Sequence, residues 1–128
     1  MSREVVNVGS AATVGPYSHA CAGGGLLFLS GQTPIDPATG ALVTGSIQAQ
    51  TQQCFANLFA VLEAAGLTPD DVVNVQVYLV DMRDFAAMNE AYATRFGTPY
   101  PARTTIGVAS LPLGASVEIG LVARTRQA

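Results

Sequence analysis

The sequence predicts an α+β domain in which two helices pack on one face of a mixed sheet of about six strands. Residues 46–65 and 81–96 carry apolar side chains at steps of three and four, which is the spacing of amphipathic helices. Shorter apolar or alternating segments surround them and predict the element order β-β-β-α-β-α-β-β. Because strand–helix–strand crossovers share one hand, both helices are expected on the same face. The 128 residues show no linker or repeat, so we expect one domain spanning 1–128.

The first three strands are predicted at residues 3–8, 26–30 and 41–43. Residues 26–30 form a short apolar run that ends at Gly31, which is typical of a buried strand. Residues 33–40 are dense in turn formers, so a loop or hairpin is expected before the third strand.

The first helix is predicted to begin after Ser46 and to end near Gly66. A serine side chain can accept a hydrogen bond from the first helical turn, and glycine readily takes the left-handed conformation that ends a helix. The predicted buried stripe comprises Ile47, Thr51, Cys54, Phe55, Leu58, Val61, Leu62 and Ala65. The second helix is expected to start at Asp81 and to stop at Gly97, with Phe85, Met88, Tyr92 and Phe96 buried.

Alternation of side chains assigns the faces of the remaining strands, which are predicted at residues 71–80, 103–109 and 116–124. The side chains expected to face the helices are Val73, Val75, Val77, Leu79, Thr104, Ile106, Val108, Val117, Ile119 and Leu121. The opposite face should then carry the apolar side chains of Val72, Val80, Ala109 and Val122, without a helix to cover them. An uncovered apolar face favours an oligomer.

Composition supports that expectation and excludes several chemistries. Charged residues make up only 12% of the chain, against about 25% in an average soluble domain. A surface covered by other copies explains the shortage, although an alanine- and glycine-rich composition is the alternative. All six basic residues are arginine, so a lysine-bound cofactor is excluded, and no cofactor is expected. One histidine and two cysteines (Cys21 and Cys54) cannot supply the usual zinc ligands, so no metal is expected either.

The same features bear on partners and location. A net charge of −3 with scattered arginines makes nucleic acid an unfavourable partner. No apolar run approaches the ~18 residues that a membrane span needs. Because no signal peptide is recognisable before the first strand, we expect a cytoplasmic protein without disulfides.

Arg103 and Glu118 are the charged residues that the predicted sheet makes conspicuous. If the last two strands form an antiparallel hairpin, both side chains lie on the uncovered face within one or two residue spacings. Burying a charge on that face costs free energy unless the charge is paired or serves in a functional site. One interpretation is a structural salt bridge at a subunit contact. The other is an arginine that holds a substrate carboxylate beside a glutamate that positions or deprotonates water.

Five short motifs resemble the Rid family, also called the YjgF or L-PSP family. They are Gly15-Pro16-Tyr17-Ser18, Ser30-Gly31-Gln32-Thr33-Pro34, Pro101-Ala102-Arg103-Thr104, Leu111-Pro112 and Val117-Glu118-Ile119. The resemblance implies a chorismate-mutase-like fold and a homotrimer whose sheets form a central barrel, with sites between subunits. It also implies deaminase activity, in which enamines and imines such as 2-aminoacrylate are hydrolysed to 2-oxo acids and ammonia.

The resemblance also implies roles for individual residues. Arg103 matches the arginine that grips the substrate carboxylate, and Glu118 matches the glutamate that places the attacking water. The remaining matches to the substrate cleft are Tyr17, Ser30, Gly31 and Thr105. Thr105 stands where many members have cysteine. If the role of that cysteine is a backbone N–H contact to the carboxylate, threonine preserves it; if its thiol serves regulation by modification, that feature is lost. Two other functions remain open: a non-catalytic trimer that binds 2-oxo acids and, less favoured by the acidic composition, an endoribonuclease. Glu118 separates the first of these from the deaminase, since a pure carboxylate binder does not need it.

Overall fold

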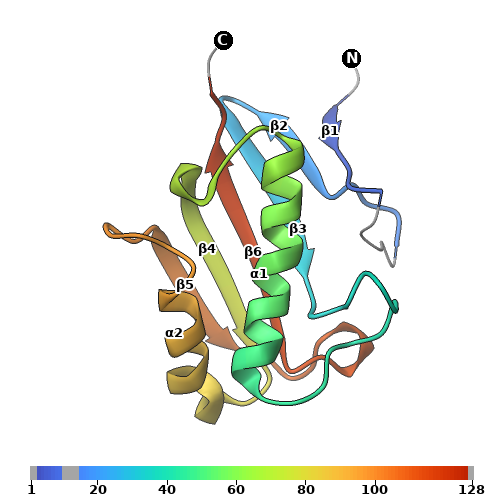
Figure 1. Ribbon diagram of the computed structural model, residues 1–128, viewed down its shortest axis with the longest axis vertical. Coiled ribbons are helices and arrows are strands. Elements are labelled where there is room, and N and C mark those ends of the chain that lie inside the picture. The colour runs from blue at the N-terminus through green and yellow to red at the C-terminus, as the bar shows by residue number, and fades with distance from the viewer. Residues whose placement is uncertain (1–2, 10–14, 127–128) are drawn as a thin grey trace.

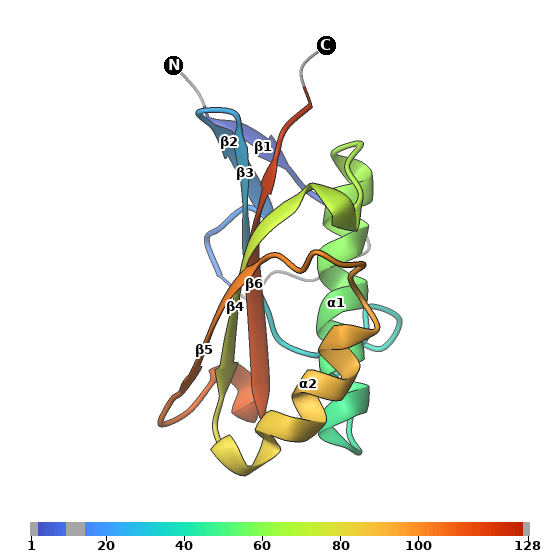
Figure 2. The same ribbon diagram turned by 90° about the vertical axis from the view of Figure 1, so that its left-hand side faces the viewer.

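A computed structural model describes residues 3–9 and 15–126 as one six-stranded sheet with two α-helices on one of its faces (Figures 1 and 2). The strands lie side by side in the order β1-β2-β3-β6-β4-β5. In chain order, the elements are β1 (Glu4–Val6), β2 (Ala20–Gly23), β3 (Leu26–Gln32), α1 (Ile47–Ala64), β4 (Val72–Leu79), α2 (Phe85–Ala93), β5 (Ala102–Gly107) and β6 (Val117–Arg124). Short 3-10 turns cover Pro69–Asp71, Met82–Asp84 and Pro112–Gly114.

The predicted order of strands and helices is confirmed, but one strand is a different segment. Ala20–Gly23 pairs antiparallel with β3 through a turn at Gly24 and Gly25, both of which have positive φ. Residues 41–43 instead contribute only an isolated bridge between Ile35 and Leu42. The prediction of a third strand at 41–43 is therefore wrong. The two glycines permit a tight hairpin that brings β2 against β3.

The first helix has the predicted caps. The Ser46 hydroxyl accepts a hydrogen bond from the Ala49 N–H, and Gly66 lies beyond the helix with φ +75°. In the second helix, Asp81 caps the 3-10 turn that precedes α2 rather than α2 itself. Both helices cover the same face of the sheet, as Figure 2 shows, and the core lies between these layers. Within the predicted stripe of α2, Phe85 is an exception, since it is 36% exposed.

A bulge in β4 corrects the predicted faces of that strand. Val72 pairs with Ala123 and Asn74 with Val122, so β4 has one extra residue at this point. Val72 consequently turns into the core, and Val73 is exposed. The other members of the predicted set, Val75, Val77 and Leu79, are buried as expected (all 1% exposed or less).

The last two strands are not neighbours, which overturns the predicted hairpin. β5 pairs in parallel with β4, whereas β6 lies between β3 and β4 and is antiparallel to both. Val77, which is buried beneath the helices, pairs with Thr105 on one side and Ile119 on the other. Because directly paired residues project to the same face, Thr105 and Arg103 face the helices. The prediction for Val117, Ile119 and Leu121 is confirmed, but Thr104 and Ile106 lie on the opposite face.

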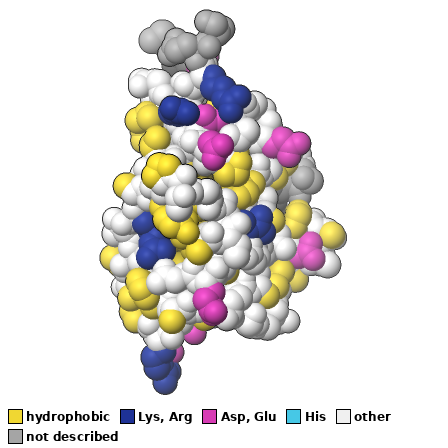
Figure 3. Space-filling view, turned by 60° about the vertical axis from the view of Figure 1, so that its left-hand side comes forward, with side chains coloured by type: hydrophobic (Ala, Val, Ile, Leu, Met, Phe, Trp, Pro, Cys, Tyr) yellow, Lys and Arg dark blue, Asp and Glu magenta, His cyan; other side chains and the backbone are white. Residues whose placement is uncertain are grey.

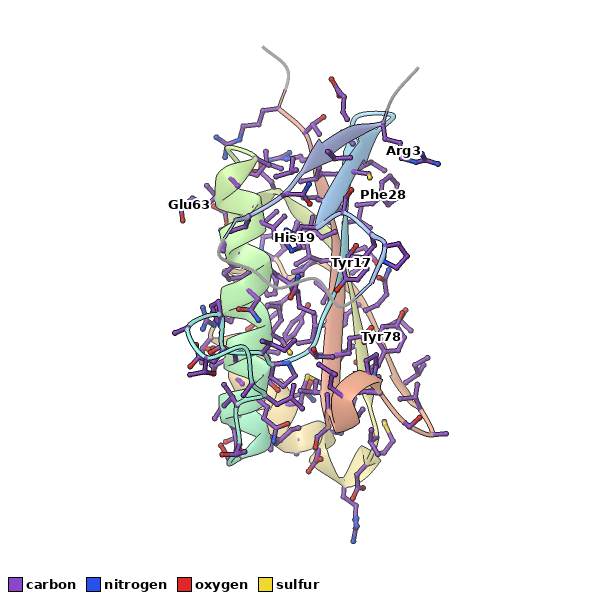
Figure 4. The ribbon with its side chains drawn as sticks, turned by 90° about the vertical axis from the view of Figure 1, so that its right-hand side faces the viewer. Arg3, Tyr17, His19, Phe28, Glu63 and Tyr78 are labelled. Atoms are coloured by element: carbon purple, nitrogen blue, oxygen red, sulfur yellow. The ribbon has the colours of Figure 1, made fainter. Side chains whose placement is uncertain are left out.

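The face of the sheet opposite the helices, called the open face below, carries several large exposed side chains. Phe28 is 49% exposed and Ile106 46% exposed. Figure 4 shows that Phe28 and Tyr78 point away from α1. An uncovered apolar face is therefore present as expected, with Val72 removed from it and Ile106 added. Cys21 and Cys54 are both free thiols. In the described segments, no helix is long and apolar enough to cross a membrane.

Candidate active site

A cleft of about 260 Å³ opens where β3 ends beside β6. Its walls come from two strands and three connecting segments, and its lining residues are Tyr17, Ser30, Gly31, Thr33, Pro112 and Glu118. Four of them, Tyr17, Ser30, Gly31 and Glu118, are residues for which the sequence suggested a site role. The cleft therefore gathers most of the predicted site. Arg103 and Thr105 do not line it.

A bulge in β3 shapes the floor of this cleft. Leu29 pairs with Leu121 and Gln32 with Ile119, so β3 has one more residue than β6 over this stretch. The bulge sets Gly31 against the side chain of Glu118. A Cβ atom on residue 31 would lie 2.6 Å from Glu118 Oε2, closer than any real contact of that kind. Only glycine leaves the carboxylate where it is.

The carboxyl group of Glu118 is half-buried and lacks a charged partner. Within residues 3–9 and 15–126, it forms no hydrogen bond or ion pair. Desolvation by burial raises the pKa of Glu118 above its ordinary value of 4.5. A raised pKa makes a carboxylate a better proton acceptor, which suits a group that must deprotonate water.

The segment before β2 is tied to the same strand end. The Ser30 hydroxyl donates a hydrogen bond of 2.6 Å to the Ser18 carbonyl oxygen, and the Ser30 N–H donates one of 2.9 Å to that of His19. These bonds hold Tyr17 over the cleft. The histidine itself has a structural position, because it is buried and its Nδ1 accepts a hydrogen bond from the Val8 N–H.

Arg103 lies on the helix side of the sheet, at its β5 edge. The central carbon of its guanidinium, Cζ, is 4.6 Å from the ring centroid of Tyr92 and 5.6 Å from that of Phe85, both on α2. No hydrogen bond or ion pair joins Arg103 to another residue in the described parts of the chain. A half-buried cation without an acidic partner is suited to bind an anion from outside the subunit.

Three buried polar atoms on β5 and α2 also lack a hydrogen-bond partner among the described residues: Thr105 Oγ1, Asn89 Oδ1 and Tyr92 Oη. Thr105 shares a strand and a face with Arg103, and the other two residues lie on α2. Unsatisfied buried polar atoms are uncommon and frequently mark functional sites. The predicted buried stripe assigned Tyr92 and Phe85 to the core, so their place beside Arg103 was missed.

The structure does not bring Arg103 and Glu118 together within one subunit. Glu118 pairs with Tyr78 on the open face, whereas Arg103 pairs with Val75 on the face that the helices cover. The expectation that they share a face is wrong. β4 lies between β5 and β6, and its pairing with β5 places Arg103 on the face opposite to that of Glu118. Within one subunit, these two candidate site residues are therefore separate. The structural salt bridge between these two residues is absent from the subunit.

Comparisons with known proteins show the family of this chain. The sequence pattern described as "Endoribonuclease L-PSP" matches residues 8–125. A RutC family protein of Pyrococcus horikoshii is 51% identical over 110 residues, which are 86% of this chain and 87% of that protein. A protein of Dermatophagoides farinae named 2-iminobutanoate/2-iminopropanoate deaminase is 44% identical over 106 residues, 83% of each chain.

Solved structures give the same result. The crystal structure of RidA from an Antarctic Psychrobacter is similar with a TM-score of 0.90 and 41% identity, over 95% of this chain and 99% of that one. Fold and sequence thus define a small α+β protein of the Rid type. The chain belongs to the endoribonuclease L-PSP family, which is the Rid family that the five motifs indicated.

Proposed function

We propose that this protein hydrolyses 2-imino acids and their enamine tautomers to 2-oxo acids and ammonia, and that it does so as a homotrimer. In this proposal, Arg103 of one subunit and the Glu118 cleft of the next complete each site. The observation that carries the proposal is that an arginine and a glutamate, each without a hydrogen-bond or ion-pair partner among the described residues, lie on opposite faces of one sheet. Each would supply half of a site, and a cyclic trimer joins unlike surfaces of neighbouring subunits.

Two further observations support it. The open face exposes large apolar side chains that association would bury, in a chain with few charges to cover its surface. The relative from Dermatophagoides farinae bears the name of a deaminase that acts on 2-imino acids with short side chains. Figure 3 adds that basic side chains are scattered on the face over α2 and β5, which does not favour RNA as the substrate.

The proposed chemistry starts with orientation of the substrate. The planar guanidinium of Arg103 can donate two parallel hydrogen bonds to the substrate carboxylate, which fixes both its position and its plane. The backbone of Ser30 and Gly31 lines the opposite wall of the completed cleft, with Tyr17 beside it. The backbone N–H of Thr105 is a further candidate donor to the carboxylate, so threonine can replace a cysteine there.

Glu118 is assigned to the water. Its carboxylate accepts a proton as the water oxygen attacks the carbon of the protonated imine, which gives a tetrahedral 2-amino-2-hydroxy acid. The same proton is then returned to the amine nitrogen, which becomes an ammonium leaving group. The C–N bond breaks and the C=O bond forms as the hydroxyl group gives its proton to the Glu118 carboxylate. Ammonia takes up this proton and leaves as ammonium with the 2-oxo acid. The imine carbon is already electrophilic, so correct placement and one acid–base group supply the required help.

The direct test is release of ammonia from 2-aminoacrylate that a second enzyme generates in the cuvette. We expect Arg103→Ala and Glu118→Gln each to lose most activity. If the two variants are unfolded and refolded together in equal amounts, activity should return to about a quarter of wild type, because about three quarters of random trimers are mixed and each of these has one intact site in three.

Each control refolds one variant alone and should show no recovery. If the mixture also remains inactive although mixed trimers are present, the shared site is wrong. A wild-type protein that binds 2-oxo acids without accelerating ammonia release would instead support the non-catalytic alternative.

A further inference from the structure

We propose that Phe85 and Tyr92 are positioning residues that form an aromatic clamp for Arg103, and that the clamp makes the site selective for carboxylates over neutral groups of the same shape. The inference rests on the proposed function, since it concerns how Arg103 recognises its ligand. Arg103 differs from the arginines of the described chain that hydrogen-bond to other residues, because aromatic rings rather than hydrogen-bond acceptors hold its guanidinium.

The clamp follows from the spacing of the two rings along α2. Phe85 and Tyr92 are seven residues apart, which is two helical turns, so both project towards β5 from the same side of the helix. The Arg103 Cζ atom lies 4.6 Å and 5.6 Å from the two ring centroids, within the ~6 Å range of a cation–π interaction. Tyr92 is only 5% exposed, so its ring has a fixed place in the core.

This kind of contact leaves the arginine's donors free. The five N–H groups of a guanidinium lie in its plane, whereas cation–π contact uses its flat face. Arg124 and Arg126 give N–H donors to Asp71, and Arg95 gives its donors to Gln52. Arg103 gives none to a described residue. The clamp therefore holds the charge without neutralising it, and the donors remain available for a ligand.

The ligand class follows from that geometry. A planar carboxylate matches two in-plane N–H donors of a guanidinium and also matches its charge. A carboxamide has nearly the same shape but only one acceptor oxygen and no charge. We therefore expect the clamp to contribute to the difference in affinity between a 2-oxo acid and its amide, and not to binding of the rest of the molecule.

The experiment measures the dissociation constants of 2-oxobutanoate and 2-oxobutanamide by calorimetry or by competition. Phe85 is partly exposed, so Phe85→Leu should fold even if Tyr92→Leu does not. Loss of one ring is expected to weaken binding of the acid about 3- to 5-fold, which corresponds to the cation–π contribution at a partly exposed site. Binding of the amide should stay unchanged, and Phe85→Tyr should restore the wild-type ratio.

A matched control exists elsewhere in the chain. Arg95 lies 5.7 Å from the ring centroid of Phe59, so Phe59→Leu removes a ring from a similar arginine–phenylalanine pair outside the proposed site. It should leave the acid-to-amide ratio unchanged. Equal weakening of both ligands in Phe85→Leu, or no weakening of either, would overturn the clamp. If wild type itself shows no preference for the acid, the proposed function fails, and the clamp fails with it.

Discussion

Gly31 lies so close to Glu118 that a single added carbon would occupy the space of the carboxylate: the Cβ of any larger residue would be 2.6 Å from Oε2. The contact depends on the bulge in β3, which moves residue 31 out of regular register with β6. The absent side chain thus creates the space in which a half-buried carboxyl group can stand without a hydrogen-bond partner among the described residues. A larger residue at position 31 should therefore disturb the candidate site without disturbing the fold.

We expect Gly31→Ala to retain the fold but to lose about 10-fold or more in turnover, because the new methyl group must displace the Glu118 carboxylate. The displaced atoms are the end of a flexible side chain, so the melting temperature should change little. Gly120→Ala is the matched control, since its Cβ would meet its nearest neighbours at an ordinary 3.6 Å. Equal activity in both variants would show that the position of the carboxylate is not critical.

Activity should fall on acidification in a range above the ordinary glutamate pKa of 4.5, because desolvation raises the pKa of Glu118 and only its ionised form accepts a proton. A rate profile of kcat/KM against pH would measure this limb, and Glu118→Gln should lack it. A profile that is flat through this range in the wild type would contradict the general-base role.

The same pKa has a consequence for stability, with a definite sign. A raised pKa in the folded state means that the folded protein holds the proton more tightly than the unfolded chain does. The wild type should therefore lose stability relative to Glu118→Gln as pH rises from below 4.5 through the folded-state pKa. Denaturant titrations of both proteins across that range would test the sign. If the charge of Glu118 instead stabilises the fold, the stability of the wild type relative to Glu118→Gln should rise with pH.

Arg103→Ala should weaken binding of a 2-oxo acid by about 2–4 kcal/mol, or about 30- to 1000-fold in Kd, while the fold persists. Arg103→Lys should recover little, because an ammonium group cannot make the planar two-point contact. Calorimetry with 2-oxobutanoate measures both effects. Unchanged binding in either variant would leave the arginine with a structural role only.

Asp71 provides a stability prediction that is independent of the site. Its carboxylate accepts hydrogen bonds from the Thr68 N–H, from Arg126 Nη2 at 2.9 Å and from Arg124 Nε at 3.3 Å, and the residue is 2% exposed. The Thr68 N–H first, and then the two arginines, lower the pKa of Asp71 below 3.8. Asp71→Asn should lower the free energy of unfolding by about 1–3 kcal/mol at neutral pH.

The difference in stability between Asp71→Asn and wild type should narrow on acidification. A depressed pKa stabilises the fold above the unfolded value of 3.8, and that stabilisation disappears as pH falls through the folded-state pKa. Thermal unfolding at about pH 3 and at about pH 7 would compare the two. The specific activity of folded Asp71→Asn should match that of the wild type, because Asp71 and its two arginine partners lie outside the proposed site.

The proposed trimer predicts a clear effect at the open face. Ile106 is 46% exposed there, and Ile106→Lys would place a charge where another subunit is expected to pack. We expect this variant to sediment as a folded monomer without deaminase activity. Glu63→Lys, on the outer side of α1 (Figure 4), should remain trimeric and active. A wild-type monomer at micromolar concentration would contradict the assembly itself.

Local patterns predicted the helices well because their information is local. The Ser46 cap, the Gly66 end and the buried stripe of α1 all follow from residues within a few turns of one another. β2 was missed because Ala20–Gly23 is short and its small side chains show no alternation of polarity. Its existence depends on pairing with β3, which is a tertiary contact.

The faces of β4 and β5 depend on long-range pairing in the same way. Alternation separates Arg103 and Thr105 from Thr104 and Ile106, but it does not say which set faces the helices. The apolar choice was wrong, since Ile106 lies on the open face. The motifs supplied the candidate site residues, whereas only the strand order and pairing show that Arg103 and Glu118 lie on opposite faces of the sheet.

Because Arg103 and Glu118 lie on opposite faces of the sheet, the proposed activity should depend on protein concentration. In the proposed trimer, every subunit serves two different catalytic centres, one through each face, so an isolated subunit has no working centre. Specific activity should then decline as the protein is diluted towards the dissociation range of the trimer, and substrate should slow that decline by bridging two subunits. The specific activity would thus measure the fraction of assembled trimer. Any agent that separates the subunits would act as an inhibitor without entering the cleft.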